Sequence, residues 1–383
     1  MKEHTIHLTP VMQPVENARG LPNEHYTSAS VFEREKRAVL FANWSGVGFG
    51  KDVPNPGDAK PISFLGMPLL LVRSQEGEIN VFQNTCRHRG MILVDEPMNI
   101  RKVIRCPYHS WCYDLNGELK TTPHVGGPGQ NTHEEICPND LSLFKIRSYV
   151  WHDVVFVNID GLAEPFETRH KDLMLRWQEF AQPAYHGGPT SSFELDVNTN
   201  WKLAVENYCE SYHLPWVHPG LNSYSRLEDH YHIEEPHQYS GQGTLVYQQL
   251  NNDNGEHFPD FQNLSTHWNK GAEYIAVYPN VLLGAHRDHL FGIVLEPISN
   301  EQTREHIELY YAESPSDSPE REQLRIENAK LWKTVFEEDI FVVEGMQRGR
   351  HGEHFDGGRF SPAMDSPTHN FHHWVASQFN SEA

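Results

Sequence analysis

Two short segments, Cys86–His88 (CRH) and Cys106–His109 (CPYH), each place one cysteine and one histidine within a few residues of each other. Seventeen residues separate the two segments. Each segment can present a thiolate and an imidazole from one tight loop, so that two loops supply four metal ligands of two chemical kinds. A fold that contains them has to bring both loops together around a metal centre.

The alternation of cysteine and histidine favours an iron–sulfur cluster with mixed ligands. In a Rieske [2Fe–2S] centre two cysteines bind one iron and two histidines bind the other, which raises the reduction potential of the cluster. Structural zinc also accepts two cysteines and two histidines, but its motifs usually keep like ligands together, as C-x₂₋₄-C and H-x₃₋₅-H. The pattern therefore predicts Cys86, His88, Cys106 and His109 as cluster ligands, with zinc as the competing interpretation.

The residues around these ligands support the same interpretation. The longer segments CRHRG and CPYHSWCYDLNG closely resemble the cluster loops of Rieske oxygenases, and Gly90 and Gly117 suit turn positions with positive φ. Residues 61–84 read as short apolar strands with a turn at Glu76-Gly77, and Tyr149–Ile159 is a further β-rich run. We therefore expect an antiparallel β domain that holds its metal between two loops.

A second group of candidate ligands lies about a hundred residues further on, in Asn200–Gly220. Asn200 is a good helix N-cap and Pro215 a helix-stopping residue, which predicts a helix through His213. On such a helix Glu206, Glu210 and His213 share one face, and carboxylates and imidazoles are poor core material unless they are paired or bound to metal. His218 follows the break and could offer a second imidazole to the same ion.

Two histidines and one carboxylate form the facial triad of a non-haem Fe(II) oxygenase, which leaves coordination positions open for O₂. The carboxylate candidates are Glu337, Glu338, Asp339 and Glu344, and their spacing alone does not choose among them. The segment resembles the helix in which Rieske oxygenases carry their third iron ligand, and Asp339 occupies the matching position. An acidic, solvated helix face suits the other three better.

From about residue 30 to its end the chain resembles the α-subunit of a Rieske non-haem iron oxygenase, in the aromatic-ring-hydroxylating dioxygenase superfamily. The segment Glu210-x₂-His213-x₄-His218 matches the family pattern, with Glu where Asp is usual, a replacement typical of the carnitine-type members. The resemblance implies a homotrimer or higher ring in which Glu210 carries electrons between subunits, from His109 of one chain to His213 of the next.

The resemblance and the strand and helix patterns together predict an α+β fold. Residues 1–40 are expected to be an N-terminal segment that packs on the catalytic domain, with a short helix around Ser28–Ala42. Residues 41–160 are expected to form the antiparallel β Rieske domain. Residues 161–383 are expected to form a catalytic domain of helices and antiparallel sheet with the mononuclear iron, including a long helix at Pro319–Gly345.

Composition excludes several other classes of protein. The formal net charge of −21 argues against binding to nucleic acid, whose phosphates it would repel. The start MKEHTIHLTP contains no apolar signal region and no apolar run approaches the length of a membrane span, so we expect a cytoplasmic protein without membrane contact. Five cysteines, two of them assigned to iron, do not make a disulfide framework.

The sequence contains no flavin- or NAD-binding fingerprint and no plant-type ferredoxin motif. Reducing equivalents are therefore expected from a separate NAD(P)H-dependent reductase, with or without a ferredoxin. The remaining partners are O₂ and a small-molecule substrate.

The substrate is the least determined part of the sequence-based prediction. Likeness to the carnitine, choline and betaine group implies hydroxylation or demethylation of a small quaternary ammonium compound, which aromatic faces bind through cation–π attraction. The candidate contacts are Tyr208, Tyr212, Trp216, His286 and Arg287. A ring-hydroxylating dioxygenase acting on an aromatic acid is the alternative, and a non-catalytic electron carrier is disfavoured by the second metal site. Mono- or dioxygenation, trimer or hexamer and the choice of reductase stay open.

Overall fold

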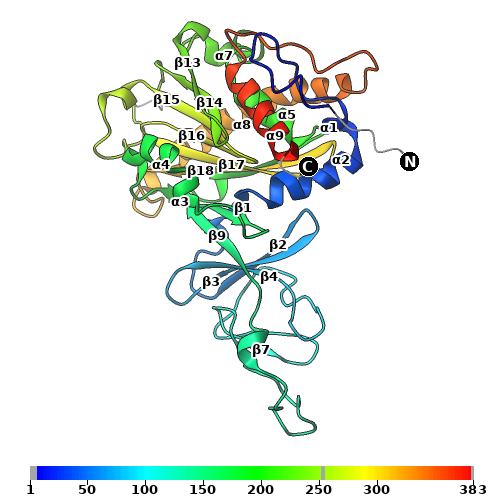
Figure 1. The fold of residues 1–383 in the computed structure, drawn as a ribbon. Helices are drawn as coiled ribbons and strands as arrows, with labels where there is room; N and C mark the ends of the chain where they lie inside the picture. The colour runs from blue at the N-terminus through cyan, green and yellow to red at the C-terminus, as the bar shows by residue number, and fades with distance from the viewer. Residues whose placement is uncertain (1–6, 252–254, 381–383) are drawn as a thin grey trace. The chain divides into compact units, whose positions relative to one another are not determined.

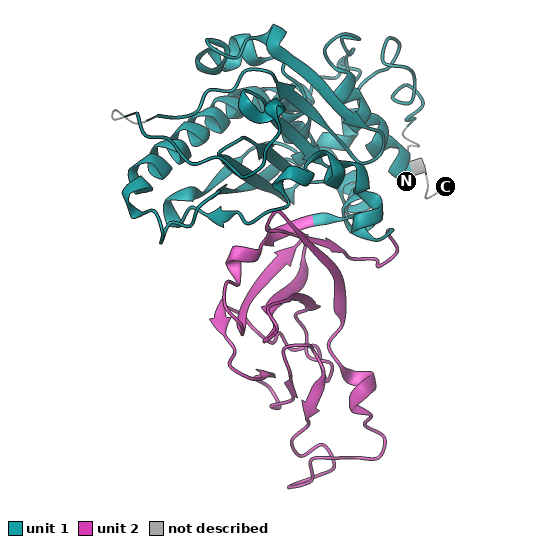
Figure 2. Cartoon of the chain, turned by 90° about the vertical axis from the view of Figure 1, so that its left-hand side faces the viewer, with its two compact units in different colours: residues 1–45, 164–383 teal, residues 46–163 magenta. Residues whose placement is uncertain are grey.

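The computed structural model describes residues 7–251 and 255–380, in which the chain separates into two compact units. One unit is Gly46–Ala163, and the other combines Met1–Ser45 with Glu164–Ala383 (Figure 2). The N-terminal segment thus belongs to the same unit as the second half of the chain. The α+β fold expected from the sequence is confirmed, with a β domain and a mixed domain that each have their own core (Figure 1).

The smaller unit is built from two antiparallel sheets. A seven-stranded sheet has the order β1-β10-β9-β4-β3-β2-β5, and a three-stranded sheet has the order β6-β7-β8. Its strands are β1 Ser45–Phe49, β2 Asp58–Phe64, β3 Met67–Arg73, β4 Ile79–Gln83, β5 Met98–Asn99, β6 Ile104–Arg105, β7 Cys112–Tyr113, β8 Leu119–Thr121, β9 Lys145–Trp151 and β10 Val154–Asn158.

Turn chemistry in the sequence sets the hairpins of this unit. Leu65 and Gly66 connect β2 and β3 with φ of 52° and 82°, the signature of a two-residue turn that matches the twist of the flanking strands. The expected turn at Glu76-Gly77 joins β3 to β4, with φ of 91° at Gly77. A buried cluster that includes Phe82, Tyr113, Cys86 and Cys106 fills the space between the sheets and the two cysteine loops.

The larger unit is an eight-stranded antiparallel sheet with helices packed against it. The strand order is β11-β18-β17-β16-β15-β14-β13, with β12 also paired to β18. The strands are β11 Tyr185–His186, β12 Ser192–Val197, β13 His230–Glu235, β14 Tyr239–Thr244, β15 Ala272–Val277, β16 Val281–Ala285, β17 His289–Ser299 and β18 Gln302–Tyr311. The expected strands near residues 274, 291 and 307 are β15, β17 and β18.

Three helices contribute most to the packing of this unit. Helix α9 packs on β13 and β14, α5 packs on β15 and β17, and α8 packs on α5 and β12 (Figure 1). The helices are α1 Glu24–Thr27, α2 Ala29–Glu35, α3 Phe166–Arg169, α4 Lys171–Arg176, α5 Trp201–Tyr208, α6 Leu214–Val217, α7 Pro219–Asn222, α8 Glu322–Gly349 and α9 Ser366–Asn380.

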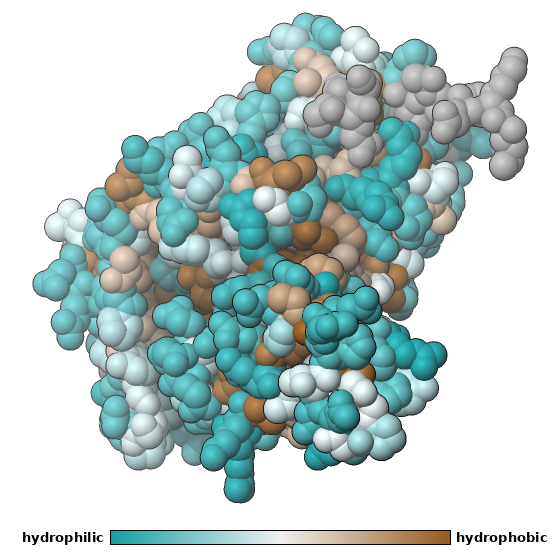
Figure 3. Space-filling model, turned by 60° about the horizontal axis from the view of Figure 1, so that its bottom comes forward, coloured by the Kyte–Doolittle hydropathy of each residue, from teal (hydrophilic) through white to brown (hydrophobic). Residues whose placement is uncertain are grey.

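In the part of the chain described here, every helix is too short or too polar for a membrane span. The face shown in Figure 3 is mostly hydrophilic, with small scattered apolar patches.

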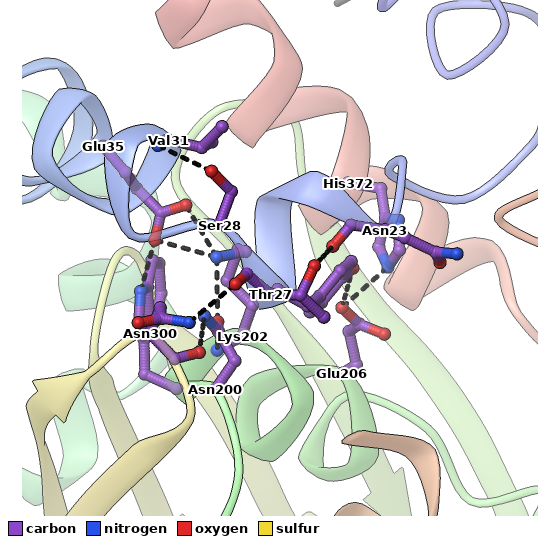
Figure 4. A network of polar contacts seen from close by, with 12 residues as sticks. Asn23, Thr27, Ser28, Val31, Glu35, Asn200, Lys202, Glu206, Asn300 and His372 are labelled. Carbon is purple, nitrogen blue, oxygen red and sulfur yellow. Dashed lines mark hydrogen bonds and ion pairs between the residues drawn. The ribbon is translucent and has the colours of Figure 1, made fainter. Parts of the chain in front are cut away.

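A buried network of charged and polar groups fixes the start of α5 to the N-terminal segment (Figure 4). Lys202 Nζ lies 2.6 Å and 2.8 Å from the two carboxylate oxygens of Glu35, and neither side chain is exposed. Asn200 caps α5 and also accepts from Lys202 Nζ at 2.8 Å. Because burial raises the pKa of Glu35 and lowers that of Lys202, each charge depends on the other to stay in the core.

Lys202→Met is therefore expected to lower the free energy of unfolding by about 3–5 kcal/mol, because it leaves the Glu35 charge buried without a counter-ion. Urea denaturation of the variant measures the loss. Lys333→Met on the exposed side of α8 is the matched control, since Lys333 only approaches Glu337 at 3.8 Å in solvent. A loss below about 1 kcal/mol for Lys202→Met would show that the ion pair contributes little.

Candidate metal centres

The two cysteine loops of the smaller unit share one backbone geometry. In each loop the cysteine N–H donates to the carbonyl five residues later, and the N–H four residues later donates back to the cysteine carbonyl. The four bonds, of 2.8–3.0 Å, are Cys86 to Met91, Gly90 to Cys86, Cys106 to Trp111 and Ser110 to Cys106. The residue that closes each loop has a left-handed φ, 74° at Gly90 and 59° at Ser110, which explains the glycine in the first loop.

This geometry separates the thiols from the imidazoles. Cys86 and Cys106 are buried and not joined in a disulfide, whereas His88 and His109 lie toward the surface with ring centroids 4.7 Å apart. Trp111 stacks on His88 at 4.7 Å and holds its ring. Burial raises the pKa of Cys86, and the neighbouring Cys106 adds to that shift, so two thiols this close need a cation to become thiolates.

These residues fit a [2Fe–2S] cluster with mixed ligands. The two thiols sit together on the inner side and the two imidazoles together on the outer side, as an asymmetric cluster requires. His109 Nδ1 is buried and makes no hydrogen bond within the described chain, which suits a metal-ligating nitrogen. The other three cysteines are not part of this group: Cys112 is partly buried, Cys209 is buried and Cys137 is exposed.

The prediction of one continuous helix through Glu206, Glu210 and His213 is wrong. Helix α5 ends at Tyr208, because the Glu210 carboxylate accepts the backbone N–H groups of Tyr212 and His213 and turns the chain. Pro215 opens α6 instead of ending α5. Glu206 points away from the candidate metal site.

Glu206 is buried in a second polar cluster that ties α5 to three distant segments. Its carboxylate accepts from Tyr26 Oη at 2.5 Å and lies 3.5 Å from Arg350. It also lies 3.1 Å from His372 (Figure 4). Burial alone would raise the pKa of Glu206, but His372, Arg350 and Tyr26 lower it below its ordinary value. This carboxylate thus stays charged and fixes the helix that precedes Glu210.

The structure brings His213, His218 and Asp339 together, although 121 positions separate His218 from Asp339 in the sequence. One possible ligand atom from each lies within 4.8 Å of the others. Asp339 Oδ1 is 3.6 Å from His213 Nε2 and 3.0 Å from His218 Nε2, yet it is buried without a well-formed hydrogen bond. This donor set fits a 2-His-1-carboxylate iron site.

Each of the two candidate histidine ligands also contacts a second carboxylate, through Nδ1, the ring nitrogen that does not approach Asp339. His213 Nδ1 lies 2.6 Å from Glu210 Oε1, and His218 Nδ1 lies 2.8 Å from Glu338 Oε2. Such contacts fix the tautomer that leaves Nε2 available for metal. Burial lowers the pKa of His218, but Asp339 and Glu338 raise it above the ordinary value overall, so the negative field of the site favours a cation there.

A cavity of about 380 Å³ opens onto the three candidate ligands. Its wall combines these ligands with aromatic side chains from α5, β15, β17 and α8 and from the segments that follow α7 and β14: Tyr208, Tyr224, Tyr247, Tyr274, Phe291, Trp332 and Phe336. Trp332 and Phe336 precede Asp339 by seven and three residues on α8 and lie on the same helix face, so the spacing in the sequence already carried a signal for this wall.

The structure places only one of the five predicted substrate contacts on this wall, Tyr208. Tyr212 and Trp216 pack on each other and are 43% and 71% exposed. His286 is fully buried behind the wall, with Nε2 3.1 Å from Tyr274 Oη, and Arg287 pairs with Asp260. These four predictions are corrected. Tyr212 and Trp216 lie in the turn and short helix that follow α5, where the expected continuous helix does not form. For His286 and Arg287, periodicity in the sequence does not show which side of a strand end faces a cavity.

Sequence reasoning also missed residues that the geometry places at the site. Glu338 was assigned to a solvated face, and its side chain is 38% exposed, yet it contacts His218. Tyr247 and His289 line the cavity and were not considered. Glu338 adjoins Asp339 and could have been noted for that reason, whereas no local pattern marks the other two.

Two known protein families match most of the chain. Residues 174–381 match the family described as ring hydroxylating alpha subunit (catalytic domain), and residues 43–142 match the Rieske [2Fe-2S] domain. The carnitine monooxygenase oxygenase subunit of Acinetobacter pittii is 24% identical over 344 residues, 88% of this chain and 86% of that protein. The putrescine 2-hydroxylase of Ralstonia nicotianae is 28% identical over 388 residues, 96% and 97% of the two chains.

Solved structures show the same fold. The quaternary ammonium Rieske monooxygenase CntA, crystallised with an inhibitor, superposes with a TM-score of 0.77 and 22% identity over 97% of this chain and 98% of that one. The catalytic-domain match spans more than half of the described fold and contains all three candidate iron ligands. The chain therefore belongs to the ring-hydroxylating α-subunit family of Rieske non-haem iron oxygenases, whose members carry a [2Fe–2S] cluster and a mononuclear iron.

Proposed function

We propose that this protein is the oxygenase component that uses O₂ and reductase-supplied electrons to hydroxylate or demethylate a small quaternary ammonium compound. The observation that carries the proposal is the cavity of about 380 Å³, which joins the three candidate iron ligands to a wall of aromatic rings. Aromatic faces attract a methylated ammonium group and do not require its complete dehydration. The similarity to the carnitine monooxygenase subunit supports the same substrate class.

The proposed cluster ligands are Cys86, His88, Cys106 and His109. Both thiols are buried and both imidazoles lie on the outer side, which supports this assignment over zinc. Because Nδ1 of His109 is the buried nitrogen, Nε2 is the atom that can face another group from outside. The proposed mononuclear iron ligands are His213, His218 and Asp339.

Bound iron of this type supplies the activation of O₂. The protein's own contribution is to hold the ligand set and the substrate. Glu210 and Glu338 hold the Nδ1 atoms of the two histidines, and the aromatic wall orients the cationic group of the substrate.

Glu338→Gln is expected to weaken iron binding by roughly 10- to 100-fold, because the His218 ring loses its charged partner at Nδ1. Competition with a chelator measures the iron affinity. The matched control is Glu337→Gln, which removes a half-exposed carboxylate from the neighbouring position of α8 and should leave the affinity unchanged. Equal iron affinity in both variants would show that Glu338 has no role at the site.

We also propose two kinds of protein partner, an electron-donating reductase and further copies of this chain. The family draws electrons through a separate reductase, and we propose an NAD(P)H-dependent one, with or without a ferredoxin. We also propose a homotrimer in which Glu210 connects His213 to His109 of a neighbouring subunit. The Glu210 side chain is 14% exposed, so a neighbouring chain can reach it.

A diamine is a second candidate substrate, because the putrescine 2-hydroxylase is 28% identical over nearly the full length of both chains. An aromatic acid, converted to a cis-diol, is the alternative that likeness to ring-hydroxylating enzymes suggests.

The test is a substrate screen with reductase and NADH, in which O₂ uptake and products are measured for choline, glycine betaine, carnitine, putrescine and benzoate. Coupled O₂ and NADH consumption with a quaternary ammonium compound supports the proposal. Turnover of putrescine alone, or a cis-diol from benzoate with inert ammonium compounds, replaces it by the corresponding alternative.

A further inference from the structure

A buried carboxylate lies directly behind the cavity wall and has no role in holding the candidate iron ligands. Asp288 follows β16, and its side chain is completely buried. Its carboxylate accepts from Tyr247 Oη at 3.0 Å and 3.3 Å and from His289 Nδ1 at 2.9 Å. Both donors line the cavity, so a single layer of side chains separates this carboxylate from the space where substrate binds.

The histidine partner does not neutralise the charge. His289 Nε2 accepts the indole N–H of Trp332 at 2.8 Å, and since Nδ1 donates to Asp288, both ring nitrogens are occupied in the neutral form. His286 stacks on His289 with centroids 4.2 Å apart and interplanar angle 8°. Burial and the nearby His289 place the pKa of His286 well below its ordinary value, so that ring also stays neutral.

The nearest cation in the sequence is already paired. Arg287 makes a double contact with Asp260 and donates to the Asn269 carbonyl at 2.8 Å. In the described part of the chain, no lysine or arginine bonds to Asp288, and none is among the residues that line the cavity. Tyr247, whose pKa burial and the Asp288 charge raise, remains a neutral donor. Arg287 interacts with the Asp288 charge only through space. Asp288 therefore adds a buried negative charge, with no cation bonded to it, behind the part of the wall that Tyr247 and His289 form.

We propose that Asp288, acting through Tyr247 and His289, is the counter-charge for the cationic group of the substrate. This inference rests on the proposed function and narrows its substrate class. A buried anion attracts an organic cation more strongly than a solvated one does, since the local dielectric is low. It also repels a substrate carboxylate, so the cavity favours carboxylate-free cations such as choline over carnitine and glycine betaine.

The position of the charge sets where the cationic end of the substrate lies. Trp332, which holds His289, and Asp339 are seven residues apart on α8, about two turns or roughly 10 Å along the helix. The ammonium group is thus drawn toward the Trp332 end of the wall, and the other end of a small cation extends toward the candidate iron ligands.

The test compares binding of choline and of its uncharged carbon isostere, 3,3-dimethylbutan-1-ol, to the iron-loaded protein by calorimetry. Wild type is expected to bind choline more tightly than either the isostere or glycine betaine. Asp288→Asn should weaken choline binding roughly 10- to 100-fold, because the cation loses its electrostatic attraction to the carboxylate. The affinity for the uncharged isostere should change by less than about twofold. The isostere serves as an internal control, since damage to the cavity would weaken both ligands alike.

Two results overturn the inference while the proposed function stands. One is equal weakening of choline and the isostere by Asp288→Asn, which indicates a purely structural role. The other, independent of any variant, is wild-type binding of glycine betaine or the isostere as tight as that of choline. Failure of the proposed function looks different: wild type then binds none of the cations and turns over benzoate.

Discussion

Replacing Asp339 with alanine is expected to remove the mononuclear iron and leave the [2Fe–2S] cluster in place. Asp339 is the only carboxylate that approaches both His213 Nε2 and His218 Nε2 in the described structure, at 3.6 Å and 3.0 Å. Two imidazoles alone bind iron weakly, and loss of a direct ligand should cost more than the roughly 10- to 100-fold caused by losing an outer partner. Turnover should therefore fall by more than about 100-fold.

Metal analysis measures this result directly. Wild type should contain about three irons and two acid-labile sulfides per chain, as one cluster and one mononuclear site require, and the variant about two of each. Glu337→Ala, which removes a half-exposed carboxylate two positions earlier on α8, is the matched control and should keep all three irons. Retention of the third iron by Asp339→Ala, or stoichiometric zinc in iron-replete wild type, would contradict the assignment.

The parts of the candidate site that could be proposed from the sequence without the family resemblance are those built by local chain geometry. Each cysteine loop closes on itself with hydrogen bonds four and five residues apart, so each pair of candidate ligands, Cys86 with His88 and Cys106 with His109, lies within one short segment. The α+β fold, expected from the strand and helix patterns together with the resemblance, is confirmed. The short helix expected around Ser28–Ala42 begins with α2 at Ala29, and Ser28 is its N-cap. Asp339 needed the family resemblance, because its approach to His218 depends on the tertiary fold.

The wrong predictions involve side chains whose partners come from distant segments. Glu206 has the right helical spacing for a metal ligand, yet Tyr26, Arg350 and His372 turn it into the core. Local periodicity cannot reveal such partners, which lie 144 to 180 positions away. Asp288 was missed for the same reason, because its proposed role depends on its contact with Tyr247 on the cavity wall, 41 positions away in the sequence.

Glu210→Gln is expected to preserve both metals and to stop turnover, with a loss of roughly 100-fold or more. Glu210 Oε1 lies 2.6 Å from His213 Nδ1, and Oε2 accepts two backbone N–H groups, so the charge sits at the junction between the imidazole and the turn after α5. Glutamine keeps the size of the side chain but loses the charge that, in the proposed trimer, joins His213 to His109 of the neighbouring subunit.

Stopped-flow spectroscopy distinguishes this role from a purely structural one. The reductase should reduce the cluster of Glu210→Gln at the wild-type rate, and the reduced cluster should then fail to reoxidise when substrate and O₂ are added. Glu228→Gln, a change of the same chemistry at an exposed carboxylate, should behave as wild type. If Glu210→Gln loses iron, the carboxylate mainly orients His213, and if it reoxidises normally, electrons reach the iron without it. The bridge role requires that Glu210→Gln keeps its full metal content and that its cluster stays reduced after substrate and O₂ are added.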